Sequence, residues 1–121
     1  MLINIFGGKK IFDYPKSIFT VKDFISLAPK GIVLDFFSGS CTTAHAVMKL
    51  NSEDNGDRKF IMVQLPEKLD ERSEAYKNNY DTLCDIGKAR IKLSGDRILS
   101  ENKGKDGIEN LDIGFKVLKL D

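Results

Sequence analysis

Two short apolar segments stand out in a chain that is otherwise mostly polar. The first is Gly31 to Phe37, interrupted only by Asp35, and the second is Lys59 to Leu65, which Pro66 closes. Apolar runs of this length are typical of strands that are covered on both faces, as in a parallel sheet. Between them, Thr42 to Leu50 has apolar residues at helical spacing. The order strand, helix, strand predicts a βαβ unit, and therefore an α/β fold with a mainly parallel sheet.

Weaker patterns predict the elements on the N-terminal side. Residues Ile11 to Ser17 are expected to be extended, since Tyr14 precedes a proline and is disfavoured in a helix. Thr20, followed three residues later by Asp23, resembles the start of a helix with Thr20 as its N-cap. Pro29 is predicted to end that helix.

The C-terminal half is predicted to be helical before a final strand. Glu67 to about Leu93 is rich in charged and helix-favouring residues, which indicates one helix, or two with a joint near Gly87. Residues 101–110 form a polar loop with two glycines. Gly114 to Leu120 alternates between polar and apolar residues and predicts a terminal strand. The sequence shows no internal repeat, so residues 1–121 are interpreted as one small domain.

Composition bounds the class of protein without assigning a function. The 121 residues carry 19 basic and 18 acidic side chains, a formal charge of +1, whereas free-standing nucleic-acid binders usually have a clear basic excess. Apolar runs stay below the roughly 20 residues that cross a bilayer, and the start of the chain does not resemble a signal peptide. We therefore expect a cytoplasmic protein in which Cys41 and Cys84 are free thiols. Two cysteines and one histidine argue against a zinc site.

The candidate chemistry lies where the first predicted strand meets the helix, in the turn Ser38-Gly39-Ser40. Gly39 has no side chain and lets a ligand approach the backbone. The helix start aims free N–H groups at the strand end, where open α/β sheets bind ligands. An ordinary βα turn explains the small residues equally well. A P-loop is excluded because no lysine follows the turn, and a dinucleotide turn because Gly39 is the only glycine in it. What remains is a turn suited to a small ligand with an amino-acid part.

Longer stretches make this interpretation specific. Asp35 to Ser40 followed by Thr42 to Ala46 resembles the S-adenosylmethionine (AdoMet) binding motif of the amino-methyltransferases that modify adenine or cytosine in DNA. The stretches that resemble the modification subunit of type III restriction-modification systems are Phe12–Ser17, Arg58–Glu67, Asp85–Ile91 and Gly114–Asp121. The resemblance implies a partial Rossmann-like methyltransferase fold with three layers (α/β/α), AdoMet as cofactor, and methylation of adenine N6 in DNA.

The resemblance also implies a cofactor site. Its candidate residues are Lys16, Ser17, Asp35, Phe36, Phe37, Ser38, Gly39, Ser40, Thr42 and Gln64. The backbone from Phe37 to Ser40 would hold the methionine part of AdoMet. Asp35 would accept from the cofactor's ammonium or brace the turn, and Thr42 would cap the helix or touch the carboxylate. Gln64 stands where relatives often carry an acid that binds the ribose hydroxyls. Lys16 would approach the carboxylate or remain solvated.

Two departures from the family pattern change the expected function. Cys41 stands where the family has glycine, and its side chain either crowds the cofactor or imposes a costly backbone angle. No Asp-Pro-Pro-Tyr motif occurs, and in this class that catalytic motif precedes the cofactor motif. We therefore expect no catalytic residue, no activity by the chain alone, and a larger parent subunit. The alternative is a non-catalytic interaction module that complements a separate N-terminal half. DNA and the restriction subunit are expected as partners of the full subunit only.

The absent catalytic half has a structural consequence. In the sheet that the chain resembles, the strand carrying the catalytic motif lies beside the strand Gly31 to Phe37. Without it, this strand is expected to be an edge with unpaired backbone groups and apolar side chains. Such edges recruit other strands, so we expect a homodimer, a swapped element, or a cover formed by Met1 to Phe6.

Three other features are interpreted as structural. His45 lies in the first turn of the predicted helix and has no partner in the sequence that would make it a base. Nothing marks Cys84 as a nucleophile. The basic residues Lys88, Arg90 and Lys92 are predicted to form a solvated helix face rather than a DNA contact.

Overall fold

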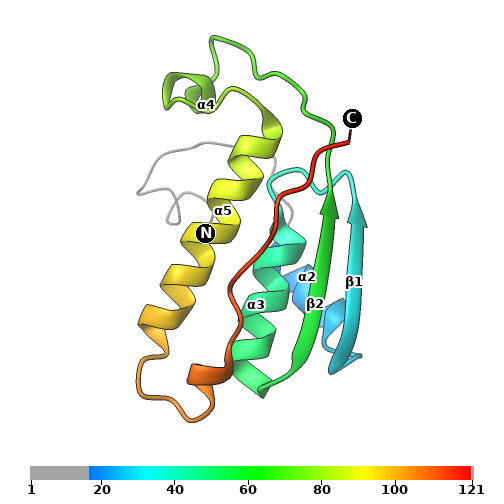
Figure 1. The fold of residues 1–121 in the computed structure, drawn as a ribbon, viewed down its shortest axis with the longest axis vertical. Helices are drawn as coiled ribbons and strands as arrows, with labels where there is room; N and C mark the ends of the chain where they lie inside the picture. Colours follow the sequence, from blue (N-terminus) through cyan, green and yellow to red (C-terminus); the bar gives the residue numbers. More distant parts are fainter. Residues whose placement is uncertain (1–16, 121) are drawn as a thin grey trace.

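The computed structural model describes residues 17–120, in which helices pack on one side of a small sheet (Figure 1). The elements are α2 (Ile18–Ile25), β1 (Lys30–Phe36), α3 (Thr42–Asp54), β2 (Asp57–Val63), α4 (Glu74–Lys77), α5 (Leu83–Glu101) and the 3-10 helix η1 (Ile108–Asn110). The predicted α/β class is confirmed. Within this range, every helix is too short or too polar to span a membrane.

The two strands run parallel, and α3 forms the crossover between them. The register pairs Lys30 with Asp57 at one end of the sheet and Phe36 with Val63 at the other. Each strand begins within two residues of the apolar run that predicted it. The βαβ unit is therefore confirmed, and it brings the carboxyl ends of β1 and β2 together at one edge of the sheet.

The largest apolar core lies between α3, α5 and the inner face of the sheet. Its cluster consists of Cys41, Ala44, Met48, Ile91 and Ile98, with Phe60, Met62, Leu111 and Ile113 packed against it. α3 also contacts α2 on another side. A helix that is surrounded in this way is buried around most of its circumference, which explains why even Thr43 and His45 are less than 10% exposed.

No element among residues 17–120 covers the outer face of the sheet. Side chains alternate between the two faces of a strand, and the outward residues are Ile32, Leu34, Phe36, Ile61 and Val63, each between 36% and 65% exposed. Of the three expected layers, residues 17–120 form two, one of helices and one of strands. Within the same range β1 has a partner strand on one side only, as expected of an edge strand, and its pairing in the whole chain stays a prediction. The Met1 to Phe6 cover lies outside the described residues.

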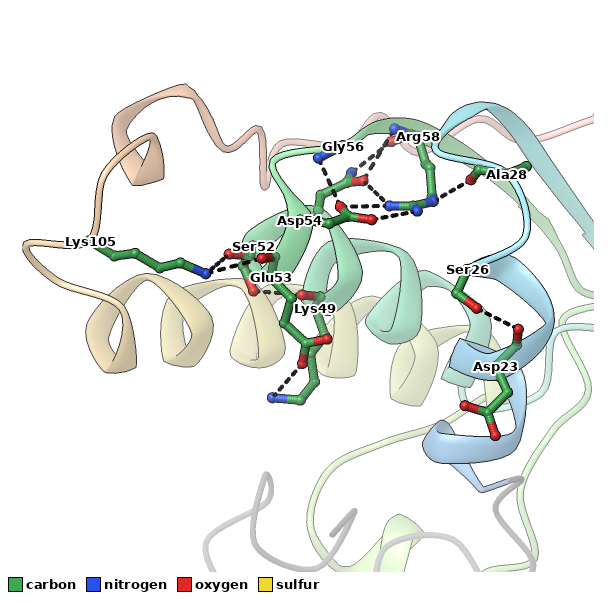
Figure 2. A network of polar contacts seen from close by, with 11 residues as sticks. Asp23, Ser26, Ala28, Lys49, Ser52, Glu53, Asp54, Gly56, Arg58 and Lys105 are labelled. Carbon is green, nitrogen blue, oxygen red and sulfur yellow. Dashed lines mark hydrogen bonds and ion pairs between the residues drawn. The ribbon is translucent and has the colours of Figure 1, made fainter.

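A cluster of polar contacts lies at the amino ends of the two strands (Figure 2). The buried Arg58 guanidinium donates to the Asp54 carboxylate at 2.7 and 3.0 Å, to Asn51 Oδ1 at 3.2 Å and to the Ala28 carbonyl at 2.7 Å. Lys105 donates to carbonyl oxygens in the last turn of α3. These contacts join the end of α3 to the loop before β1 and the loop after α5. The carboxyl ends of the strands lie at the far edge of the sheet from this cluster.

Two helix predictions need correction. The first helix begins directly after Ser17, not after Thr20, because Ile18 is 1% exposed and its burial draws the helix start back. α5 runs without a joint through Gly87. Thr82 and Asp85 form a capping box that starts α5, and Gly87 lies where α5 approaches Cys41.

The predicted terminal strand is not formed within residues 17–120. Residues 111–120 have no strand pairing, although β1 and β2 each have a free edge among the described residues. Instead Ile113 packs close to α5 at Gly95, where an added Cβ would lie 3.0 Å from the Ile113 Cβ. The preceding polar loop is also shorter than predicted, since α5 continues to Glu101 and η1 occupies Ile108–Asn110.

Candidate functional site

The turn after β1 has an uncommon backbone geometry. Phe37, Gly39 and Cys41 have φ angles of 58°, 57° and 62°, in the left-handed region that few residues other than glycine adopt. The Ser38 N–H donates to the Val63 carbonyl at 3.0 Å, and the Cys41 N–H donates to the Ser38 carbonyl at 2.9 Å. The turn is therefore fixed against the end of β2 and leads directly into the N-terminus of α3.

Gln64 joins the two strand ends. The Gly39 N–H donates to Gln64 Oε1 at 2.8 Å, and Gln64 Nε2 donates to the Leu65 carbonyl at 3.3 Å. The resemblance assigns Gln64 and the turn to one cofactor site, and the structure brings the two into contact. The side-chain oxygen of Gln64 thus holds the turn, and the contact with the ribose hydroxyls stays a prediction.

Asp35 braces the start of α3. The Thr43 hydroxyl donates to Asp35 Oδ2 at 2.6 Å, which ties the end of β1 to the first turn of the helix. This contact is the second of the two roles predicted for Asp35. The contact with a cofactor ammonium remains a prediction.

The other candidate residues divide between exposed and buried positions. Lys16 lies outside the described residues, and Ser17 is exposed at the start of α2. The aromatic side chains of Phe36 and Phe37 are 63% and 65% exposed at the strand end. The buried candidates are Ser38, Ser40 and Thr42. The two aromatic residues are therefore at the surface, whereas Ser38, Ser40 and Cys41 are buried and Gly39 is half-buried.

A buried arginine behind the turn corrects the sequence prediction. Arg90 is only 1% exposed, although it is predicted to lie on a solvated face. Its Nη1 donates to Ser40 Oγ at 3.0 Å and to Thr42 Oγ1 at 2.8 Å. Lys88 and Lys92 do extend towards solvent. The prediction failed because the three basic residues do not share one face of α5, and Arg90 alone is on the side that packs on α3.

His45 completes this network. The Nε and Nη2 atoms of Arg90 lie 3.3 and 3.2 Å from His45 Nδ1. Because a guanidinium only donates, Nδ1 must accept, and the imidazole is neutral. Burial, together with the Arg90 charge, lowers the pKa of His45 to about 3, and burial lowers the pKa of Arg90 to about 10. At neutral pH the network therefore carries one positive charge, and His45 has the structural role predicted for it.

The Cys41 side chain occupies space that the absence of a side chain at Gly87 leaves beside α5. Its side chain is 6% exposed, and its Sγ lies 3.6 Å from Ser38 Oγ. A Cβ added at Gly87 would lie 2.7 Å from this Sγ, so the glycine leaves room for the thiol. Burial raises the pKa of the Cys41 thiol. Of the two consequences predicted for a side chain at this position, the structure shows the unusual backbone angle.

The comparisons with known proteins agree with the resemblance described above. No family model matches the sequence. The chain is 40% identical over 117 residues to the StyLTI Mod subunit of Salmonella typhimurium, and 41% identical over 111 residues to the EcoP15I Mod subunit of Escherichia coli. Both are type III restriction-modification enzymes, and the alignments cover 95% and 90% of this chain. Over 90% or more of its length, the chain is thus similar to one segment of type III modification subunits.

A methyltransferase relative bears on the fold, and the alignments show how much of each relative the chain spans. The chain is 37% identical over 97 residues to the type II methyltransferase M.KpnI of Klebsiella pneumoniae. With these methyltransferase relatives, the parallel βαβ unit is part of a Rossmann-like fold. The chain spans 17% and 15% of the two modification subunits and 23% of M.KpnI. It therefore corresponds to one portion of a type III modification subunit.

Proposed function

We propose that the chain is the AdoMet-binding portion of a site-specific DNA adenine N6-methyltransferase from a restriction-modification system. The main support for this proposal is the turn Phe37 to Cys41. Its backbone is fixed at the carboxyl ends of two parallel strands and leads into the N-terminus of α3. Open α/β sheets bind ligands at this edge, and a helix N-terminus favours an anionic group such as the methionine carboxylate of AdoMet. Asp35 then accepts from the ammonium, and Gln64 meets the ribose hydroxyls.

Calorimetric titration of the purified chain with AdoMet tests this proposal. We expect saturable binding by the natural sequence and its loss in Gly39→Val, since a branched side chain cannot adopt φ +57° without strain. Gly104→Val is the matched control, because Gly104 has φ +85° in an exposed loop with no atom near its would-be Cβ. The control should bind as the natural chain does. Absence of binding by the natural chain would overturn the proposal.

We further propose that the chain does not transfer the methyl group by itself. Methylation of a base amine needs the base held outside the helix stack, with its nitrogen aligned on the methyl carbon. The 121 residues contain no Asp-Pro-Pro-Tyr segment that would hold the base. Labelled AdoMet and DNA should therefore give no more label in adenine with the chain than without protein. DNA and a restriction subunit are proposed as partners of the whole enzyme.

The second candidate function is an interaction module that completes a separate catalytic half. The bare sheet face favours it, because parallel sheets are normally covered on both faces and contiguous exposed apolar residues mark interfaces. We expect the chain to form a complex with the part of the StyLTI Mod subunit outside the aligned segment. Leu34→Lys, on the bare face, should prevent the complex in size-exclusion chromatography. Leu120→Lys, at a residue that is 100% exposed, is the matched control. Equal assembly by both variants would contradict this function.

A further inference from the structure

A buried positive charge lies directly behind the turn proposed to bind the cofactor. Arg90 donates to the hydroxyls of Ser40 and Thr42 and to the imidazole of His45, all of which are neutral. No carboxylate among residues 17–120 contacts its guanidinium. A buried charge without an opposite charge is unfavourable. The Arg90 guanidinium would therefore attract an anion that binds at the turn.

Ser40 provides a directional link from Arg90 to the ligand. Its Oγ accepts from Arg90 Nη1 at 3.0 Å, and the side chain is 3% exposed. A hydroxyl has one hydrogen, and that hydrogen cannot point at a guanidinium, which has no acceptor. Arg90 thereby fixes the Ser40 hydroxyl as a donor, and its hydrogen has no acceptor within residues 17–120, so a group that enters beside the turn could accept it.

We propose that Arg90 is a positioning residue that holds the Ser40 hydroxyl as a donor for the carboxylate of AdoMet and favours that carboxylate by its charge. This inference rests on the proposed function. AdoMet also carries an ammonium and a sulfonium, and a positive charge behind the turn disfavours both. The carboxylate is the one anionic group of the cofactor, so Arg90 determines which end of the amino-acid part faces Ser40.

Two ligands that differ only at the carboxylate test this inference. One is S-adenosylhomocysteine, and the other is its primary amide, in which a neutral CONH2 replaces the carboxylate. The measured quantity is the ratio of their dissociation constants for the full chain. We expect the natural chain to prefer the acid about tenfold, as for a charge-assisted hydrogen bond. Arg90→Met should reduce this preference to about threefold or less, because the charge is lost. Arg90→Lys should restore part of it.

A second pair of variants keeps the test decisive if Arg90→Met does not fold. Ser40→Ala removes the proposed donor but leaves Arg90 its contacts with Thr42 and His45, and should also reduce the preference for the acid. Ser94→Ala is the matched control, since Ser94 is a buried serine on α5 whose Oγ has no hydrogen-bond partner among residues 17–120. An unchanged preference in Arg90→Met, or in Ser40→Ala, overturns the inference while leaving AdoMet binding intact. A natural chain that binds neither ligand overturns the proposed function as well.

Discussion

Gly87→Ala is expected to have opposite effects on stability in two backgrounds. In a regular helix, alanine is about 1 kcal/mol more favourable than glycine. At position 87, however, the added Cβ would lie 2.7 Å from Cys41 Sγ. This sulfur is buried against α5, and the backbone that carries it is fixed in the left-handed region. Overpacking of this kind costs about 1–3 kcal/mol, so Gly87→Ala should leave the natural chain unchanged or destabilise it by up to about 2 kcal/mol.

The substitution Cys41→Gly removes the atom that causes the clash. The nearest remaining contact of the new Cβ is the Gly39 carbonyl at 3.5 Å, an ordinary van der Waals distance. Gly87→Ala should then stabilise the chain by about 1 kcal/mol. Cys41→Gly alone should change stability little, because relief of a left-handed backbone angle, about 1–2 kcal/mol, is offset by lost thiol burial and by the greater freedom of glycine in the unfolded chain.

Urea unfolding of the four proteins gives the coupling free energy. The two single changes, the double change and the natural chain form a double-mutant cycle, and we expect a coupling of about 1–3 kcal/mol in favour of the double variant. The slope of the unfolding free energy with urea should be the same for all four, which shows that the folded state is retained. A coupling below about 0.5 kcal/mol would mean that the Cys41 thiol does not occupy the space beside Gly87.

Three further predictions follow from individual contacts. Because the pKa of His45 is lowered to about 3 in the folded chain, the unfolded chain takes up a proton first as the pH falls. The unfolding free energy should then decrease between pH 6 and 4 by up to about 1.4 kcal/mol per pH unit, and the decrease should be smaller in His45→Gln when followed by urea unfolding. Gln64→Leu, which removes the acceptor for the Gly39 N–H, should weaken AdoMet binding about tenfold in calorimetry, whereas Gln64→Glu should keep or improve it. Asp54→Asn should lower the thermal midpoint, because the buried Arg58 loses its carboxylate at a cost of about 1–3 kcal/mol.

The features that could be predicted depend on local sequence. The apolar runs that became β1 and β2 are continuous, so they indicate strands without knowledge of their neighbours. The turn around Gly39 and the helix after it follow from the short, small residues between the first run and Ala44. Because parallel strands align their carboxyl ends, these patterns also place Gln64 near the turn. The outline of the candidate site is therefore contained in the sequence.

The features that could not be predicted depend on contacts between distant segments. Charged residues are almost always exposed unless they are paired, so composition alone placed Arg90 on the surface. Its burial depends on which face of α5 meets α3, and its partner Ser40 is 50 residues away in the chain. Likewise, the alternation in Gly114–Leu120 suits a strand, but a strand forms only beside another backbone. The need for glycine at position 87 could not be predicted for the same reason, since it comes from the side chain of Cys41, which is distant in the sequence.

Cys84, in the first turn of α5, allows chemical labelling close to the candidate site without an engineered cysteine. Both cysteines are free, but Cys41 is buried whereas Cys84 is partly exposed. Desolvation raises the pKa of the Cys84 thiol, so alkylation should be slow at neutral pH and faster in mild alkali. The Cys84 thiol donates to the Gln64 carbonyl at 3.4 Å. The rate at which Cys84 is alkylated therefore reports on movements of the backbone beside Gly39, while Cys41 remains unmodified as an internal reference in the same chain.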